Sequence, residues 1–382
     1  MGRQPALGIA ELESLYGSDG LRVVSDSIVQ LAKDPSEIVF GRLGGSIKHA
    51  KLLTILPTTS WPELIRYITR SLPEHLKYIP EGKVKCGLSV YDLSVKVDQI
   101  NKAGLEIKRV IKKTGRSVRV VPNKELALNS AQVLHNSLTG PLGLELLLIR
   151  DGQKTILAQT VAGQNIEAYA RRDQARPKRD ARVGMLPPKL AQTIINLARP
   201  DLVGTILDPF CGTGVVLQEA LLMGFSTYGS DIDQRMVEFT RENVVTWLLN
   251  DDDTGRVQLE HGDATAHVWE TPFDAIATET YLGQPFSAPP SPDKLHEVTQ
   301  TCNTITKKFL RNLAKQTSPG FRLCLAVPAW KTVRGFTHLP TLEKLAELGY
   351  NRVSFVHVSD HDLLYYRPDQ IVARELVTLI RK

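Results

Sequence analysis

Short apolar runs alternate with helically spaced apolar residues throughout the C-terminal half of the chain. The expected strands lie at 205–208, 226–231, 257–261, 274–277 and 321–327, and the expected helices lie at 190–197, 215–223, 234–249 and 295–314. A hairpin of 352–358 with 371–380 follows. Helices that separate buried strands require the strands to run parallel, with helices on both faces of the sheet. This half therefore predicts a doubly wound α/β sheet, whose ligands bind beyond the carboxyl ends of the strands.

The N-terminal half mixes the two periodicities over shorter stretches. Apolar runs at 21–24 and 51–56, with helical patterns at 9–16 and 27–33, predict a small α+β unit over residues 1–60. A second α/β unit is expected over residues 61–165. Its predicted elements are strands at 84–90 and 117–121, a helix at 94–111, and a hairpin of 144–150 with 155–160. The Asp151-Gly152 pair between the two hairpin strands favours a primed turn.

A glycine turn with the sequence DPFCGTG, residues 208–214, connects the first strand of the C-terminal sheet to its helix. Gly212 and Gly214 permit backbone angles closed to other residues and let a ligand approach the main chain. The dinucleotide-binding fingerprint needs a third glycine where Leu217 stands, and the lysine of a phosphate loop is absent. Asp208 repels phosphate and attracts a cation. S-adenosylmethionine, which carries an ammonium group and no pyrophosphate, fits this charge pattern.

The same residues resemble a known family. The DPFCGTG run is similar to the DPFCGTG/DPFCGSG motif of the THUMP-containing RNA methyltransferases, in particular the tRNA guanine-N2 group, and the similarity extends to segments at 5–17, 42–48, 169–197 and 366–375. The resemblance implies a class I (Rossmann-like) methyltransferase domain with a seven-stranded sheet at residues 185–382. It also implies a ferredoxin-like domain at 1–60, a THUMP RNA-binding domain at 61–165 and a basic linker at 166–184.

Acidic residues follow the next two strands, at positions suited to the rest of the cofactor. Asp231 ends the second strand, where an acid can accept both ribose hydroxyls. By resemblance, Asp263 stands where family members place the acceptor for the adenine amino group. As alternatives, Asp231 only caps the next helix and Asp263 only makes a turn. The expected cofactor-binding residues are Asp208, Phe210, Gly212, Gly214, Asp231, Ile232, Asp263 and Ala264.

The loop after the fourth strand departs from the family pattern. Residues 278–283 read TETYLG, where the family normally carries Asp-Pro-Pro-Tyr. In amino methyltransferases this loop accepts the N–H groups of an exocyclic amine, and its aromatic ring stacks on the extruded base. Thr278 takes the place of the acid, Glu279 could supply the missing oxygen from a shifted loop, and Tyr281 keeps the ring. These three are the expected catalytic residues.

Basic residues gather in two stretches. Residues 102–124 hold eight lysines and arginines against one acid, Glu106, and the linker 166–184 is also rich in basic side chains. Such stretches favour binding to RNA phosphates, while a solvated helix face and a linker that is packed and merely soluble are the alternatives. The expected RNA-binding residues are Lys108, Arg109, Lys112, Lys113, Arg116, Arg172, Arg176, Lys178 and Arg179.

Composition narrows the class of protein without deciding it. The 382 residues, 42% of them hydrophobic, suffice for two or three domains with real cores, and a net charge of +6 favours an anionic partner. Four widely spaced cysteines form neither a zinc motif nor a disulfide framework, which favours a reducing cytoplasm. Neither a signal peptide nor a membrane-length apolar run is expected. His357 and His361 offer too few converging ligands to predict a metal site.

These patterns favour a cytoplasmic RNA methyltransferase that depends on S-adenosylmethionine, has tRNA as its partner and needs no metal. By resemblance, the expected acceptor is an exocyclic base amine, guanine N2. Two alternatives stay open: a non-catalytic RNA-binding protein that keeps the fold, and a methyltransferase that acts on a DNA base or on another RNA atom. The sequence does not identify a protein partner.

Overall fold

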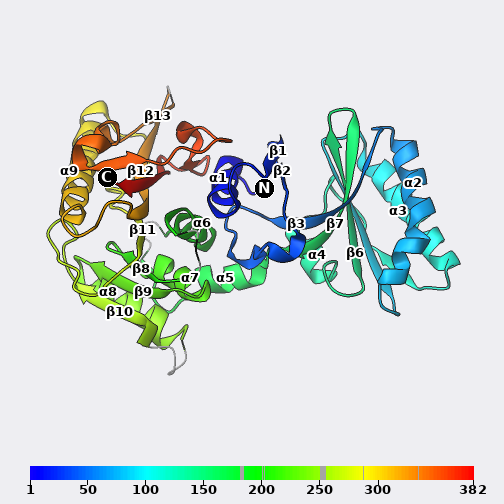
Figure 1. Cartoon of the computed structure of the whole chain (residues 1–382), viewed down its shortest axis with the longest axis horizontal. Helices are drawn as coiled ribbons and strands as arrows, with labels where there is room; N and C mark the ends of the chain where they lie inside the picture. Colours follow the sequence, from blue (N-terminus) through cyan, green and yellow to red (C-terminus); the bar gives the residue numbers. More distant parts are fainter. Residues whose placement is uncertain (181–184, 200, 202, 250–254, 287, 334) are drawn as a thin grey trace. The chain divides into compact units, whose positions relative to one another are not determined.

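The computed structural model describes residues 1–180, 185–199, 201, 203–249, 255–286, 288–333 and 335–382. The chain divides into two compact units (Figure 1). The larger unit comprises Met1–Ala32, Arg42–Gly45 and Tyr169–Lys382, and is named the catalytic unit after the activity expected of the C-terminal half. A second unit comprises Lys33–Gly41 and Ser46–Ala168. The last four positions of the expected linker, 181–184 with Arg182, lie outside the described residues.

A mixed sheet forms the centre of the catalytic unit, and its described strands run in the order β10-β9-β8-β11-β12-β16-β14. The first five of these strands are parallel neighbours, and β16 is antiparallel to both β12 and β14. Their bounds are Thr205–Asp208 (β8), Ser226–Asp231 (β9), Val257–His261 (β10), Ala275–Glu279 (β11), Arg322–Thr332 (β12), Tyr350–Arg352 (β14) and Val372–Arg381 (β16). Two short strands, β13 (Gly335–Thr337) and β15 (Leu364–Tyr365), pair with β12 and β16.

Helices cover both faces of this sheet because its strands carry apolar residues in unbroken runs. Ile206 points into a core formed with α1, α6 and α7, whereas its neighbour Leu207 points into the opposite core, formed with α9. The helices of this unit are α1 (Pro5–Tyr16), α6 (Pro188–Ala198), α7 (Val215–Leu222), α8 (Gln234–Arg241) and α9 (Pro292–Leu313). The expected helix 234–249 is shorter, since its second part continues as a π-helix, η4 (Glu242–Thr246).

The second unit is a five-stranded sheet of described residues in the order β3-β7-β6-β4-β5. Its strands are β3 (Lys48–Leu56), β4 (Val84–Tyr91), β5 (Val118–Val120), β6 (Gly143–Asp151) and β7 (Lys154–Gly163). Helices α2 (Trp61–His75) and α3 (Val97–Lys113) lie side by side on one face (Figure 1). Ile100, Ile107 and Ile111 of α3 lie on one stripe of the helix and fill the core beneath it. A short helix, α4 (Ser130–His135), touches β7.

The remaining described elements are short. They are β1 (Leu21–Ser25), β2 (Ile28–Leu31), α5 (Ile166–Gln174), and the 3₁₀ helices η1 (Pro35–Glu37), η2 (Phe40–Arg42), η3 (Leu76–Tyr78), η6 (Pro340–Leu348) and η7 (Asp360–Asp362). Among the helices described, none is long and apolar enough to cross a bilayer. All four cysteines are buried and unpaired.

The expected ferredoxin-like domain over residues 1–60 is corrected by this structure. Helix α1 packs on α6 of the catalytic unit, whereas β3 completes the sheet of the second unit by pairing with β7. The expected helix 27–33 is instead the strand β2, which forms a hairpin with β1. A short segment with three apolar residues in four, bounded by turns, is compatible with a helix or a strand, and here the pairing with β1 makes it a strand.

The expected hairpin of 352–358 with 371–380 is also shorter than predicted. Strand β14 ends at Arg352, and the backbone N–H groups of Val356 and His357 donate to the carboxylate of Glu13 instead of to a strand. A carboxylate that satisfies these donors removes the need for a ladder partner. His357 thereby serves the junction between α1 and the C-terminal segment.

Candidate functional site

A cavity of about 700 Å³ opens at the carboxyl ends of β8, β9 and β11. Seven of the eight expected cofactor-binding residues line it, the exception being Gly214, which begins α7. Glu279, the last residue of β11, and Tyr281, from the loop after it, line the same cavity. Residues that are more than 70 positions apart in the sequence therefore meet around one space, as expected at this edge of a doubly wound sheet.

The turn requires glycine at positions 212 and 214 for two different structural reasons. Gly212 has φ +51°, in the left-handed region, and its N–H donates to Asp231 Oδ2 at 2.9 Å. Gly214 has φ +83°, and a Cβ there would lie 2.9 Å from Thr240 Cγ2 of α8. Any larger residue would push α8 away from the turn. The turn thus holds Asp231 through one glycine and the neighbouring helix through the other.

Asp208 is almost completely buried at the end of β8. Its Oδ1 accepts from Thr278 Oγ1 at 2.5 Å and from the Phe210 N–H at 3.3 Å. Burial raises the pKa of this carboxyl to about 7, although both hydrogen bonds oppose the shift. The group therefore sits near its titration point at neutral pH. A cation placed beside it would favour the ionised form.

Asp231 is held in the cavity by two backbone donors. The N–H groups of Gly212 and Asp233 each lie 2.9 Å from one of its carboxylate oxygens. Burial raises its pKa, and these hydrogen bonds oppose the change. The alternative role as a helix cap falls to Asp233, whose side chain accepts from the Arg235 N–H at 2.9 Å.

Asp263 is exposed and accepts from the Thr265 N–H at 2.9 Å, so it does make a turn. It also lines the cavity next to the buried Ala264. Phe210 packs edge-on against Phe309 of α9, with ring centroids 5.2 Å apart, and presents apolar surface to the same space. Ile232 is 67% exposed and forms part of the rim.

The expectation that Thr278 accepts a substrate amine is corrected. Its side chain is completely buried, and its hydroxyl donates to Asp208. A hydroxyl committed in this way organises Asp208, so Thr278 is a positioning residue on the cofactor side. Tyr281, by contrast, is 43% exposed and lines the cavity.

Glu279 is the buried carboxylate that remains on this loop. Its Oε1 pairs with Arg374 Nε of β16, and the side chains of both residues are largely buried. Burial raises the pKa of Glu279, and Arg374 opposes the shift. A carboxylate that is oriented by a fixed guanidinium and faces a cavity is suited to accept an N–H hydrogen bond and then the proton.

The basic residues of the expected linker are mostly engaged within the catalytic unit. Arg172 pairs with Glu219 at 2.8 Å and stacks on Tyr169, and Lys178 pairs with Glu242 at 3.2 Å. Arg176 is buried and donates to Thr213 Oγ1 at 3.3 Å. Arg176 and Arg172 thus support the glycine turn and α7, and the RNA contact expected of them stays a prediction. Arg179 is exposed.

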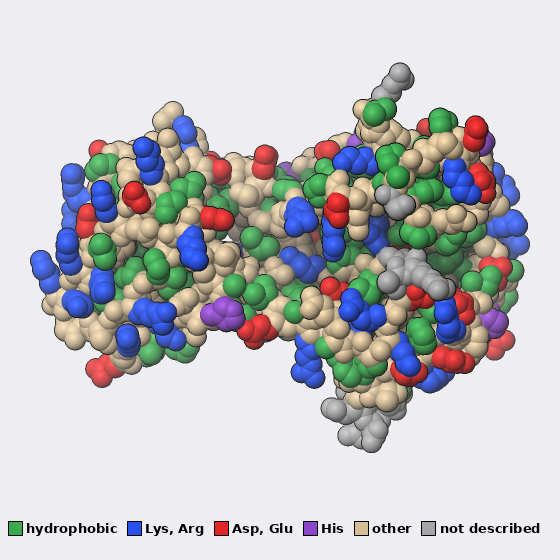
Figure 2. Space-filling model, turned by 180° about the vertical axis from the view of Figure 1, so that it is seen from behind, with side chains coloured by type: hydrophobic (Ala, Val, Ile, Leu, Met, Phe, Trp, Pro, Cys, Tyr) green, Lys and Arg blue, Asp and Glu red, His purple; other side chains and the backbone are tan. Residues whose placement is uncertain are grey.

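In the second unit, Arg116 is also structural. Its guanidinium donates hydrogen bonds to the backbone carbonyls of Leu76, Ile79, Pro80 and Gly82. These hydrogen bonds tie the end of α2 to the loop after it. The expectation that Arg116 contacts RNA is therefore corrected. Arg109, Lys112 and Lys113 of α3 are exposed, and Lys108 is half-buried. Figure 2 shows lysine and arginine side chains along the outer left edge, over the helical layer of this unit.

Several lining residues are not among the site residues expected above. Met185, Leu186 and Lys308 line the cavity, and Arg374 holds Glu279. The sequence does single out Arg374 as a candidate for a buried charge, because it is the one arginine within the largely apolar run 371–380. Nothing local indicates its partner, which lies 95 positions away. Among the described residues, no group of three or more His, Cys, Asp or Glu could hold a metal ion.

Comparison with known proteins agrees with this architecture. Residues 176–354 match the protein family described as RMKL-like, methyltransferase domain. The matched range lies within the catalytic unit. The prediction of a class I methyltransferase fold in the C-terminal half is confirmed.

Curated relatives and solved structures extend the comparison. The tRNA (guanine(10)-N2)-dimethyltransferase of Methanothermobacter thermautotrophicus is 35% identical over 145 residues, which cover 38% of this chain and 39% of the relative. That of Pyrococcus abyssi is 38% identical over 115 residues, which cover 29% of this chain and 33% of the relative. The match thus spans well under half the length of these relatives. TrmN from Thermus thermophilus superimposes with a TM-score of 0.52 at 16% identity, over 99% of this chain and 97% of TrmN, and shows that the fold is shared.

Proposed function

We propose that this protein transfers a methyl group from S-adenosylmethionine to the exocyclic amine of a guanine base in tRNA. The observation that carries the proposal is one cavity in which three acidic strand-end residues meet a buried carboxylate and an exposed tyrosine. The two curated relatives named for tRNA guanine-N2 dimethylation support the choice of acceptor. The domain family supports the reaction class.

The cofactor half of the cavity fits S-adenosylmethionine, whose sulfonium supplies an electrophilic methyl group. Asp208 provides the anionic partner for the ammonium group, and Asp231 accepts the ribose hydroxyls from a fixed position. Asp263 accepts from the adenine amine, while Phe210 and Ala264 supply apolar walls. The carboxylates that line the described cavity would repel a pyrophosphate, so a dinucleotide cofactor fits it poorly.

The other half of the cavity receives the base. Tyr281 stacks on the extruded guanine, and Glu279 accepts an N–H of the amine whose nitrogen attacks the methyl group. The nitrogen lone pair is delocalised into the ring, so holding the amine in line and accepting its proton are the contributions that this chain can make. The raised pKa of Glu279 makes it a stronger proton acceptor than an ordinary carboxylate.

The second unit supplies the RNA-binding surface in this proposal. Exposed basic residues of α3 face solvent opposite the apolar stripe that anchors the helix. Such a surface binds phosphates without reading sequence. We propose that this unit is a THUMP-type RNA-binding module. A cytoplasmic location for the whole enzyme fits its four unpaired cysteines.

Neutralising this surface tests the proposed RNA contact. The triple variant R109Q/K112Q/K113Q is expected to bind tRNA more weakly, because three exposed cations of α3 are lost. The slope of log affinity against log salt should become shallower by roughly 2, since each phosphate contact contributes about 0.7–0.9. Fluorescence anisotropy of labelled tRNA between low and moderate NaCl gives both quantities.

A matched triple variant controls for net charge. Arg311, Lys315 and Lys344 are exposed on the catalytic unit and are not among the residues that line the described cavity. The variant R311Q/K315Q/K344Q removes the same charge. Its salt slope should stay close to that of the wild type. Equal slopes for the two triple variants would show that α3 makes no specific RNA contact.

Removal of the tyrosine ring tests base stacking. Y281A is expected to reduce kcat/KM for tRNA by about 5–150-fold, because stacking of one base on an aromatic side chain contributes about 1–3 kcal/mol. Y281F keeps the ring and should retain most of the activity. Calorimetry with S-adenosylhomocysteine should give the same Kd for all three proteins. If Y281F were as impaired as Y281A, the phenol oxygen and not the ring would be the functional group.

Transfer of a labelled methyl group tests the proposed function as a whole. The protein should incorporate label from S-adenosylmethionine into bulk tRNA, and should not label double-stranded DNA under the same conditions. Labelling of DNA would favour the alternative acceptor. Binding of tRNA with no incorporation into either polymer would favour the non-catalytic RNA-binding protein.

A further inference from the structure

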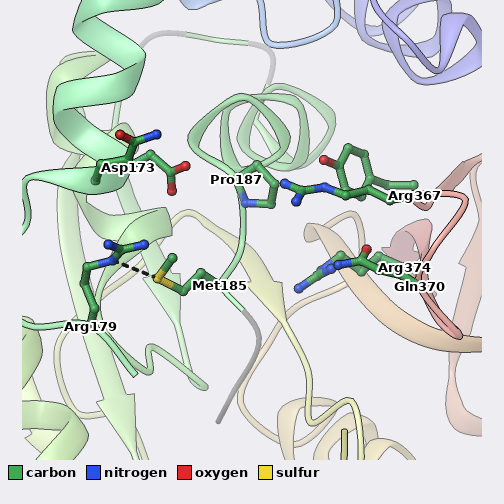
Figure 3. A pocket seen from close by; sticks show the side chains of 9 residues that line it. Asp173, Arg179, Met185, Pro187, Arg367, Gln370 and Arg374 are labelled. Carbon is green, nitrogen blue, oxygen red and sulfur yellow. Dashed lines mark hydrogen bonds between the residues drawn. The ribbon is translucent and has the colours of Figure 1, made fainter. Parts of the chain in front are cut away.

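A second, smaller cavity of about 380 Å³ lies beside the first in the catalytic unit (Figure 3). Its walls come from the end of α5 and the segment after it, and from the stretch that runs from β15 into β16. The described lining residues are Asp173, Gln174, Arg179, Met185, Pro187, Tyr365, Arg367, Gln370 and Arg374. Figure 3 shows Arg179 on one side and Arg367 and Arg374 on the other, with the latter two guanidinium groups pointing inward.

Three arginines make this cavity suited to an anion. Arg179, Arg367 and Arg374 line it together with one acid, Asp173. Glu279 pairs with Arg374 from outside the lining, and Asp369 lies close enough to Arg367 to act on it electrostatically. Gln174, Gln370 and Tyr365 add neutral hydrogen-bonding groups, and the amide oxygen of Gln370 is buried without a partner among the described residues. A buried amide oxygen of this kind is suited to accept from a ligand hydroxyl.

Two features connect this cavity to the proposed base-binding site. Met185 lines both cavities. The Glu279–Arg374 pair also joins them, because Glu279 lines the first and Arg374 lines the second. A ligand that extends from one cavity to the other would therefore pass along this pair. An extruded nucleotide has this form, with a base at one end and a ribose and phosphate at the other.

We propose that the second cavity binds a backbone phosphodiester of the substrate RNA, next to the nucleotide whose base enters the first cavity. A phosphodiester is an anion with two free oxygens, and arginine is the side chain best shaped to hold such a group. The adjacent ribose hydroxyl is the partner for the Gln370 amide oxygen. This assignment rests on the proposed function.

The test compares R179Q/R367Q with the wild type and with R311Q, an exposed arginine outside both cavities. Arg374 is left intact because it orients Glu279. In the double variant the KM for tRNA should rise about tenfold, with kcat at saturating tRNA and the Kd for S-adenosylhomocysteine unchanged. The salt slope of tRNA binding should become shallower by about 0.7–0.9, the contribution of one phosphate. R311Q should change none of these quantities.

Two outcomes would overturn the assignment. An unchanged KM and salt slope would show that the arginines only brace the fold, and a tenfold weaker Kd for S-adenosylhomocysteine would assign the cavity to the cofactor carboxylate. The single variant R367Q, at an exposed position, gives the same comparison if the double variant melts at a lower temperature. If the wild type binds tRNA but transfers no methyl group, the proposed function fails, while the salt slopes still decide whether a phosphate is bound.

Discussion

Glu279→Gln is expected to lower kcat for methyl transfer to tRNA by about 10²–10⁴-fold, the usual contribution of a positioned proton acceptor. The amide keeps an oxygen for Arg374 but cannot take a proton from the attacking amine. The Kd values for S-adenosylhomocysteine and for tRNA should change little, since neither ligand depends on that proton. Single-turnover measurements at saturating tRNA isolate this step from product release.

The pH profile provides a second readout for Glu279. Because burial raises its pKa, the wild-type rate should fall as the pH drops through that raised value, when the carboxylate becomes protonated. E279Q should lose this limb of the profile. The control variant E297Q replaces an exposed glutamate on α9 that forms a surface ion pair with Lys294, and it should behave as the wild type. Full activity of E279Q would remove Glu279 from the chemistry and reopen the question of the acceptor atom.

Asp208→Asn is expected to weaken S-adenosylmethionine binding by about 10–100-fold, the effect of losing a hydrogen bond to a charged group. The neutral amide keeps an oxygen for Thr278 and for the Phe210 N–H, so the strand end should retain its geometry. Wild-type affinity should also weaken as the pH falls below about 7, because the carboxyl must then release a proton to face the ammonium group. Calorimetry across pH 6–8.5 measures both effects.

Asp208→Asn should increase the folding stability of the cofactor-free protein. The folded pKa of Asp208, about 7, lies above its ordinary value of 3.8, so its contribution to stability is fully present below 3.8 and is lost as the pH rises through about 7. Ionisation then costs roughly 4 kcal/mol of folding free energy, a cost that D208N avoids. The Tm of D208N should exceed that of the wild type by an amount that grows up to pH 7 and then levels off. A Tm difference independent of pH would contradict the raised pKa.

The sheet and the cofactor residues were largely predictable from sequence because their signals are local. Apolar runs separated by helical patterns are sufficient to predict parallel strands, and the carboxyl edge then collects Asp208, Asp231 and Asp263. The THUMP assignment stays a prediction. The boundary at residue 60 was wrong because a strand belongs to whichever sheet pairs with it, and the partner of β3 lies more than 100 positions away in β7.

Individual charged residues were less predictable, because charge in a sequence does not distinguish a solvent-facing side chain from a structural one. Arg116 and Arg176 lie in basic stretches, yet one binds four backbone carbonyls and the other is buried beside the glycine turn. Thr278 occupies the family position of the catalytic acid, yet its hydroxyl serves Asp208. In each case a distant partner determines the role, and local patterns carry no information about it.

The most direct test of the central claim is mass spectrometry of nucleosides from tRNA treated with the protein and S-adenosylmethionine. We predict that N2-methylated guanosine appears with the wild type and is nearly absent with E279Q and D208N. A methyl group found on a ring nitrogen or on ribose would contradict the assignment of the acceptor amine. The appearance of no methylated nucleoside, with the protein folded and the cofactor bound, would contradict the catalytic role of the cavity altogether.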